Sequence, residues 1–221
     1  MKEEGKRIVV RLKDVHCKNT EDMSGTDEFY IAGGGGTGPD SGRTHTAILT
    51  KPIEISKGQT SIFPPEESVV FDGRVHANDF IEISLQFFDE DFKVKKDFDD
   101  KYKALVAALA TAVGAAVTSV GTPVAGAVAA AIFTATVPAL LKVLESIDKD
   151  DTLGIVEKRI ELKDLKPGSN GPFSWHFTEK ENVIREGLPK PHERFPRSEE
   201  IGYSDWGYTV RYEIDVSSAS A

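Results

Sequence analysis

The chain has 221 residues, a formal net charge of −9, 29% charged residues and a single cysteine. The acidic balance argues against nucleic acid as a partner, since no basic stripe is present to neutralise phosphates. One cysteine excludes an internal disulfide. Residues 1–12 contain at most three consecutive apolar positions, so no signal peptide is predicted. We expect synthesis in the cytoplasm, with any export route and later action at membranes left open.

Short alternating segments along the chain predict β-strands. They cover residues 7–15, 28–32, 44–55, 68–75, 79–88, 155–162, 173–177 and 208–216. Residues 186–200, rich in proline and charge, predict a long surface loop. Seven or eight short strands separated by turn residues at this spacing predict a mainly β protein, an antiparallel β-sandwich.

A glycine-rich segment, residues 33–42, follows the second predicted strand. It contains a G-x-G-x-x-G pattern at Gly33, Gly35 and Gly38. That pattern indicates a dinucleotide site only when a helix follows immediately. Here the sequence continues Pro-Asp-Ser-Gly, so we predict a flexible surface loop instead.

Residues 104–141 contain no charged side chain in thirty-eight positions. Gly121-Thr-Pro123 interrupts them, because proline cannot continue a helix and disfavours helical backbone in the residue before it. The segment therefore predicts a hairpin of two antiparallel α-helices of about seventeen residues each. Leu105, Leu109, Val113 and Val117 repeat every four residues and predict one apolar stripe.

Two interpretations of this hairpin remain open. Each arm is just long enough to span a bilayer, which takes roughly 17–25 residues, yet alanine dominates both arms, so each would insert only marginally. The same composition suits helices packed in a soluble core, and in a soluble form we predict packing against the sandwich or a second copy. The residues predicted to contact a membrane are Leu105, Leu109, Val113, Val117, Val128, Ile132 and Phe133.

Acidic motifs flank the hairpin and precede the glycine-rich segment. Phe-Phe-Asp89-x-Asp91 lies before the hairpin, and Asp150-Asp151-x-Leu-Gly lies after it. An earlier acidic loop runs from Glu21 to Asp27. Together these motifs resemble the C2 domain, a β-sandwich that binds calcium and phospholipids through aspartates on its first and third loops. The resemblance covers most of the chain outside the hairpin.

The resemblance implies calcium as a cofactor and an anionic phospholipid membrane as a partner. It implies calcium ligands at Asp22, Asp27, Asp89, Asp91 and Asp151, with Asp148 and Asp150 as second choices. Calcium takes six to eight oxygen ligands and favours clustered carboxylates. The chain departs from the family in placing fifty-six residues, 92–147, inside the third loop. The alternative interpretation is a pair of ordinary solvated acidic loops.

The predicted organisation is a C2-like sandwich, residues 1–91 and 148–221, with an inserted helical hairpin, residues 92–147. One hypothesis is a calcium-dependent membrane-binding protein that inserts its hairpin, as a pore-forming or toxin-like protein does. Several copies would then assemble, since two helices cannot line an aqueous pore. The alternative is a soluble calcium-dependent lipid- or protein-binding module whose hairpin is a structural or homo-oligomerisation element. Catalytic motifs are missing from the sequence, and the five histidines show no ligand spacing, so we do not expect an enzyme.

Overall fold

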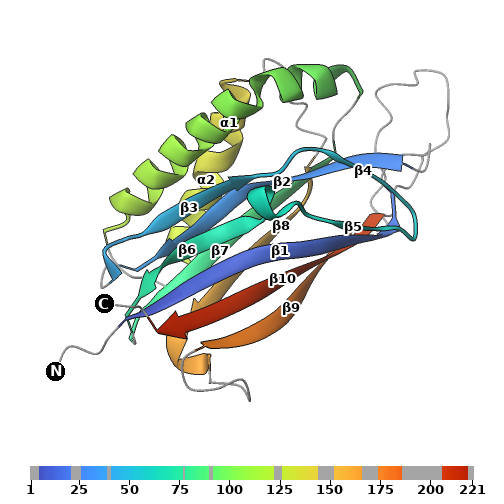
Figure 1. The fold of residues 1–221 in the computed structure, drawn as a ribbon. Coiled ribbons are helices and arrows are strands. Elements are labelled where there is room, and N and C mark those ends of the chain that lie inside the picture. The colour runs from blue at the N-terminus through green and yellow to red at the C-terminus, as the bar shows by residue number, and fades with distance from the viewer. Residues whose placement is uncertain are drawn as a thin grey trace.

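A computed structural model of the chain describes residues 5–20, 26–38, 41–76, 78–89, 92–121, 126–143, 152–165, 174–185 and 206–218. These residues form ten strands in two antiparallel sheets, together with two α-helices (Figure 1). The predicted class, a mainly β sandwich that carries a helical insertion, is confirmed.

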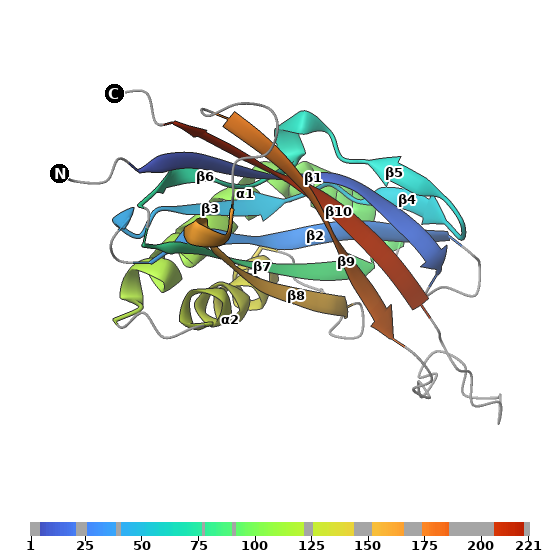
Figure 2. The same cartoon turned by 90° about the horizontal axis from the view of Figure 1, so that it is seen from below.

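Sheet A is built around β1 (Lys6–Asn19), which pairs with β10 (Trp206–Ser218) over almost its whole length. Along its other side, β1 pairs with β6 (Val69–Val75) and β5 (Thr60–Ile62). The strand β9 (Ser174–Arg185) pairs with β10 and completes the sheet. Figure 2 shows β9 and β10 crossing in front of the other sheet.

Sheet B is built around β2 (Thr26–Thr37), which pairs on one side with β3 (His45–Leu49) and β4 (Ile53–Ser56). On its other side β2 pairs with β7 (Phe80–Asp89), and β7 pairs with β8 (Thr152–Glu161). The predicted single strand at residues 44–55 is wrong. It is two strands, because the segment between β3 and β4 contains Lys-Pro, and proline has no N–H to donate to a ladder.

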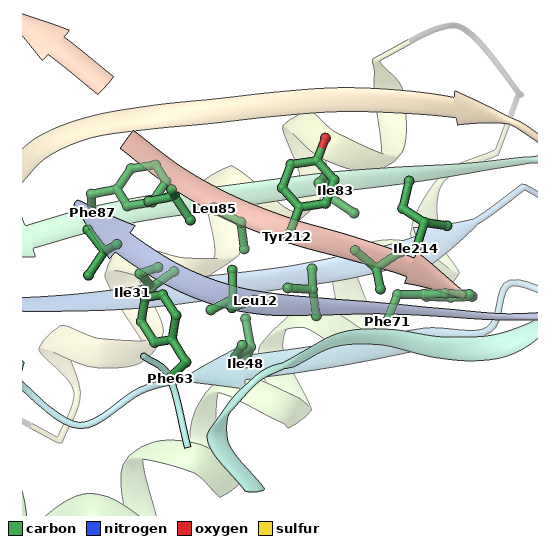
Figure 3. Packing of buried hydrophobic residues seen from close by; sticks show 14 of the residues in the cluster. Leu12, Ile31, Ile48, Phe63, Phe71, Ile83, Leu85, Phe87, Tyr212 and Ile214 are labelled. Atoms are coloured by element: carbon green, nitrogen blue, oxygen red, sulfur yellow. The ribbon is translucent and has the colours of Figure 1, made fainter. Parts of the chain in front are cut away.

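The core between the sheets consists of apolar residues from alternate positions on both sheets (Figure 3). From β7 it takes Ile81, Ile83, Leu85 and Phe87, which share one face because successive strand residues point to opposite faces. This core is what joins sheet A to sheet B.

The helices α1 (Phe92–Ser119) and α2 (Ala127–Leu141) lie between β7 and β8 in the chain. They cover the face of sheet B that is turned away from sheet A, and we call them together the helical layer (Figure 1). A second apolar cluster joins them to sheet B. In this structure the hairpin therefore packs against the sandwich, as expected for a soluble form. The predicted length of seventeen residues is wrong for α1, because the charged segment before residue 104 is also helical.

The prediction of a flexible loop is also wrong for residues 33–37, because Gly33 to Gly36 lie in the second half of β2 and are buried. A Cβ at Gly33 would lie 2.1 Å from the carbonyl oxygen of Ser84, and its φ of 151° is rare for other residues. A Cβ at Gly36 would lie 2.9 Å from Val128 and 3.1 Å from Val117. Gly36 thus lets both helices approach the sheet closely, and Gly33 leaves room for the backbone of β7. The predicted loop at residues 186–200 lies outside the described residues.

Candidate functional site

The apolar stripe of α1 faces sheet B. Leu105, Leu109, Val113 and Val117 are each at most 1% exposed and belong to the cluster between the helices and the sheet. Of the seven residues predicted to contact a membrane, six are buried here and Phe133 is 37% exposed. The buried six can reach lipid only if the helices leave the sheet.

The beginning of α1 is held by aromatic side chains. Phe98 meets Tyr30 edge to face, with ring centroids 5.1 Å apart, and Tyr30 stacks on Phe88 at 4.8 Å. The hydroxyl of Tyr102 donates to the backbone carbonyl of Leu49 at 2.8 Å. Aromatic pairs of this kind add to the stabilisation from area burial, so α1 is docked mainly by apolar contact.

The helix α2 is held differently, by the carboxylate of Glu82 on β7. Glu82 is fully buried and accepts hydrogen bonds from the backbone N–H groups of Gly126 (2.7 Å), Val128 (2.8 Å) and Ala129 (3.0 Å). The first N–H groups of a helix lack partners within it, and its dipole favours a negative charge there. The start of α2, Gly-Ala-Val-Ala, has no side chain able to cap it. Glu82, forty-four residues before Gly126, supplies the cap instead.

Arg159 of β8 balances the buried charge of Glu82. Its Nη1 lies 3.1 Å from Glu82 Oε1, its Nε donates to Glu161 at 2.5 Å, and its guanidinium lies 3.5 Å from the centroid of the Phe80 ring. Burial alone would lower the pKa of Arg159, but the hydrogen bonds and charges of Glu161 and Glu82 outweigh it and leave the pKa raised. Glu82 was not among the residues predicted from the sequence to be functional. The signal that could have found it is a glutamate at an alternate position of a strand whose other face is apolar.

Between Ala104 and Leu140 the described outward positions of the helical layer carry no charge, whereas Asp99, Asp100 and Lys103, earlier in α1, are exposed. The exposed positions from Ala104 to Gly121 and from Gly126 to Leu140 are alanine, glycine, serine, threonine, proline or phenylalanine. The threonine hydroxyls there donate within their own helix, Thr111 to Ala107 at 2.9 Å and Thr134 to Ala130 at 2.8 Å. Their donor capacity is therefore satisfied without water.

The outward face of sheet A, in contrast, carries charged side chains. Ion pairs cross its strands from Arg7 to Asp72 (2.7 Å), from Arg11 to Asp215 (2.9 Å) and from Lys13 to Glu213 (2.5 Å). Such exposed pairs contribute little stability, about 0–1 kcal/mol each, but they mark a face that is in contact with water. The outer face of sheet A is thus charged, whereas the outer face of the helical layer from Ala104 onward is not.

Among the described residues, one helical segment, Phe98–Ser119, is long and apolar enough to cross a membrane by length and composition. Its 22 residues span about 33 Å at 1.5 Å per residue, against a hydrocarbon core of about 30 Å. The core helix of a soluble protein can pass the same test, but such helices are mostly buried. Here 28% of the most apolar stretch of 18 residues in this segment is buried.

Two of the predicted calcium ligands lie within the described residues, and they are neighbours. Asp89 is paired across the ladder with Phe29, two residues after Asp27, and Asp89 Oδ1 accepts the backbone N–H of Glu28 at 2.8 Å. Asp27 is fully buried and accepts a hydrogen bond from the Tyr208 hydroxyl. Burial and the charge of Asp27 raise the pKa of Tyr208. Asp27 thus links sheet B to sheet A.

The other predicted ligands lie outside the described residues. They are Asp22, Asp91, Asp148, Asp150 and Asp151. Within the part of the chain that is described, no group of three or more His, Cys, Asp or Glu side chains could hold a metal ion. Asp27 and Asp89 alone supply fewer oxygens than the six to eight that calcium takes. The calcium site stays a prediction.

Cys17, the single cysteine, is buried beside Asp27 and Tyr208. Burial, with a smaller contribution from the negative charge of Asp27, raises the pKa of its thiol to about 11. A thiol with that pKa stays protonated near neutral pH and is unreactive, because the thiolate is the nucleophile. Cys17 is therefore a core residue.

No family model and no curated protein matches the chain. Among solved structures, a C2 domain of plant Extended Synaptotagmin 1 aligns with 100% of this chain and 100% of its own, at 10% identity and a TM-score of 0.33. The β-barrel of the InvG secretin domain from the Salmonella SPI-1 injectisome aligns with 97% of this chain and 60% of its own, at 10% identity and a TM-score of 0.13. The first of these belongs to the family that the acidic motifs resemble. At such values no ligand or site residue is carried over to this chain.

Proposed function

We propose that this protein binds anionic lipid bilayers through the outward face of its helical layer. The observation that supports this proposal most directly is the absence of charge on the described part of that face between Ala104 and Leu140. A helix on the surface of a soluble protein normally carries charged and polar residues on its outer side, and a helix that is apolar all round is buried or lies in a membrane. Here 38 consecutive positions are uncharged in a chain with 29% charged residues.

The arrangement of the layers supports the same function. The helical layer lies on the far side of sheet B from sheet A (Figure 1). A bilayer can therefore meet both helices while the ion pairs of sheet A stay in water. Shallow contact uses the exposed alanines and Phe133. Insertion, the deeper form of this proposal, requires α1 and α2 to exchange sheet B for lipid.

Vesicle binding tests the proposal with a matched pair of variants. Ala115→Glu places a charge on the exposed outer side of α1, and Ile62→Glu places the same charge on β5, at a residue that is 76% exposed. With vesicles of phosphatidylserine and phosphatidylcholine, we expect Ala115→Glu to bind at least tenfold more weakly than the wild type and Ile62→Glu to bind normally. Equal binding by all three proteins, or none by the wild type, would reject the proposal.

Calcium enters the proposal as a prediction from the C2 resemblance. Protein and membrane are both negative and repel each other, so we predict that binding is stronger with calcium. Calorimetric titration of calcium without vesicles tests this part separately, with Asp89→Asn as the variant. If the wild type takes up no calcium, the predicted calcium dependence is wrong. The vesicle experiment still tests whether the helical layer binds the membrane.

The second candidate is a module whose hairpin stays docked, favoured by the burial of the α1 stripe and the cap on α2. Dye leakage from the same vesicles separates the two candidates. Leakage supports insertion and, with it, the pore-forming hypothesis. Binding without leakage supports a docked layer that meets lipid by its outer face only.

A further inference from the structure

The face of β7 beneath α2 is polar at its centre. Glu82, Ser84 and Gln86 occupy three successive alternate positions, and each is at most 1% exposed. The side-chain amide of Gln86 donates to the carbonyl of Phe133 at 3.2 Å. Among the described residues, the hydroxyl of Ser84 has no hydrogen-bond partner. The α2 interface is thus partly polar and imperfectly satisfied.

This polarity changes what happens when α2 leaves the sheet. Exposing an apolar strand face to water costs about 25 cal/mol per Å². A carboxylate, a hydroxyl and an amide instead regain hydrogen bonds from water, and an unsatisfied buried group such as Ser84 favours that exchange. The strip formed by Glu82, Ser84 and Gln86 is therefore suited to exposure, unlike the opposite face of β7.

The bonds of Glu82 oppose release, in addition to the apolar residues of α2 that are buried against sheet B. These bonds attach the first turn of α2 to the middle of sheet B through three N–H groups and a charged acceptor. Hydrogen bonds to a charged group are about twice as strong as neutral ones. Arg159 keeps this carboxylate balanced while it is buried.

We propose that Glu82 is a latch that holds α2 on sheet B, and that α2 is the arm of the hairpin that detaches first. Its role at a membrane rests on the function proposed above, but the latch itself is a property of the protein in water. Opening it exposes a polar strip on β7 and frees the apolar side of α2, including Val128 and Ile132, for lipid. The aromatic contacts of α1 remain in place.

Amide hydrogen exchange without vesicles tests the latch. In Glu82→Gln the amide oxygen can accept fewer of the three bonds and the NH₂ group opposes the remaining donors, so we expect amides of α2 to exchange about ten- to hundredfold faster. Amides of β1 and β10 should exchange as in the wild type. The control is Glu161→Gln, which removes the other carboxylate on Arg159; no hydrogen bond described for Glu161 reaches α2.

Three results would overturn the latch. They are unchanged exchange of α2 in Glu82→Gln, equal acceleration in Glu161→Gln, and an equal loosening of sheet A, which would make Glu82 a support of the whole fold. Vesicle binding of Glu82→Gln then judges the membrane role separately. Faster α2 exchange together with stronger binding or leakage supports both proposals. Faster exchange in a protein that ignores vesicles keeps the latch and rejects the proposed function.

Discussion

The two faces of strand β7 differ in the kind of residue that they bury. Toward sheet A it presents Ile81, Ile83, Leu85 and Phe87, all apolar and at most 2% exposed. Toward the helices it presents Glu82, Ser84 and Gln86, which are equally buried, between the apolar side chains of Phe80 and Phe88. One face holds the sandwich together by exclusion of water. The other holds a helix partly by hydrogen bonds that water can replace, and the proposed latch requires that this contact open without unfolding of the sandwich.

The largest expected difference between the two faces comes from truncating neighbouring residues. Phe87 stacks on Phe29 with centroids 5.8 Å apart, so Phe87→Ala should lower the free energy of unfolding by about 3–5 kcal/mol. Gln86→Ala loses one hydrogen bond and should cost about 1 kcal/mol. Urea unfolding measures both. Equal costs would contradict the distinction between the faces.

A smaller effect is expected at the α1 side, where Tyr102 donates to Leu49. Tyr102→Phe should lower stability by roughly 1 kcal/mol near neutral pH. Burial, followed by the charges of Glu67 and Glu66, raises the pKa of Tyr102 to about 12, whereas an unfolded tyrosine titrates near pH 10. The stabilisation is therefore complete below pH 10 and is lost as the pH rises toward 12.

Unfolding of the wild type and Tyr102→Phe at a series of pH values from 8 to 11.5 measures this contribution. The difference in unfolding free energy between the two proteins should shrink above pH 10. A difference that stays constant up to pH 11.5 would show that folding does not raise the pKa of Tyr102.

The smallest effect is expected at Ser84, and it has the opposite sign. Ser84→Ala removes a buried hydroxyl without a described partner, so we expect a gain of up to about 1 kcal/mol and slower amide exchange in α2. Thr136, whose hydroxyl donates to the carbonyl of Ile132, provides the control: Thr136→Val should not stabilise the protein. Destabilisation by Ser84→Ala would mean that the hydroxyl has a partner after all.

Much of the fold followed from local patterns. Alternation along residues 79–88 predicted a strand, and the four-residue repeat from Leu105 to Val117 predicted a helix with one buried face. The glycine-rich segment was wrongly predicted to be a loop, because composition cannot distinguish a flexible loop from a strand that needs room for a neighbouring helix. Gly36 is such a case, since Val117 and Val128 lie against it. Asp27 and Asp89, which the resemblance implies as calcium ligands, lie on paired strands, while the calcium site itself stays a prediction.

The sequence by itself determined the β framework, the position of the uncharged hairpin and the apolar face of α1, because periodicity and charge are local properties of the chain. Only the tertiary structure decided what covers that face and how α2 is capped. Both depend on residues brought together from distant segments: Glu82 meets Val128 across 46 positions, and Tyr208 meets Asp27 across 181. No local pattern encodes such a pairing, since it arises only when the sheets and the helical layer pack.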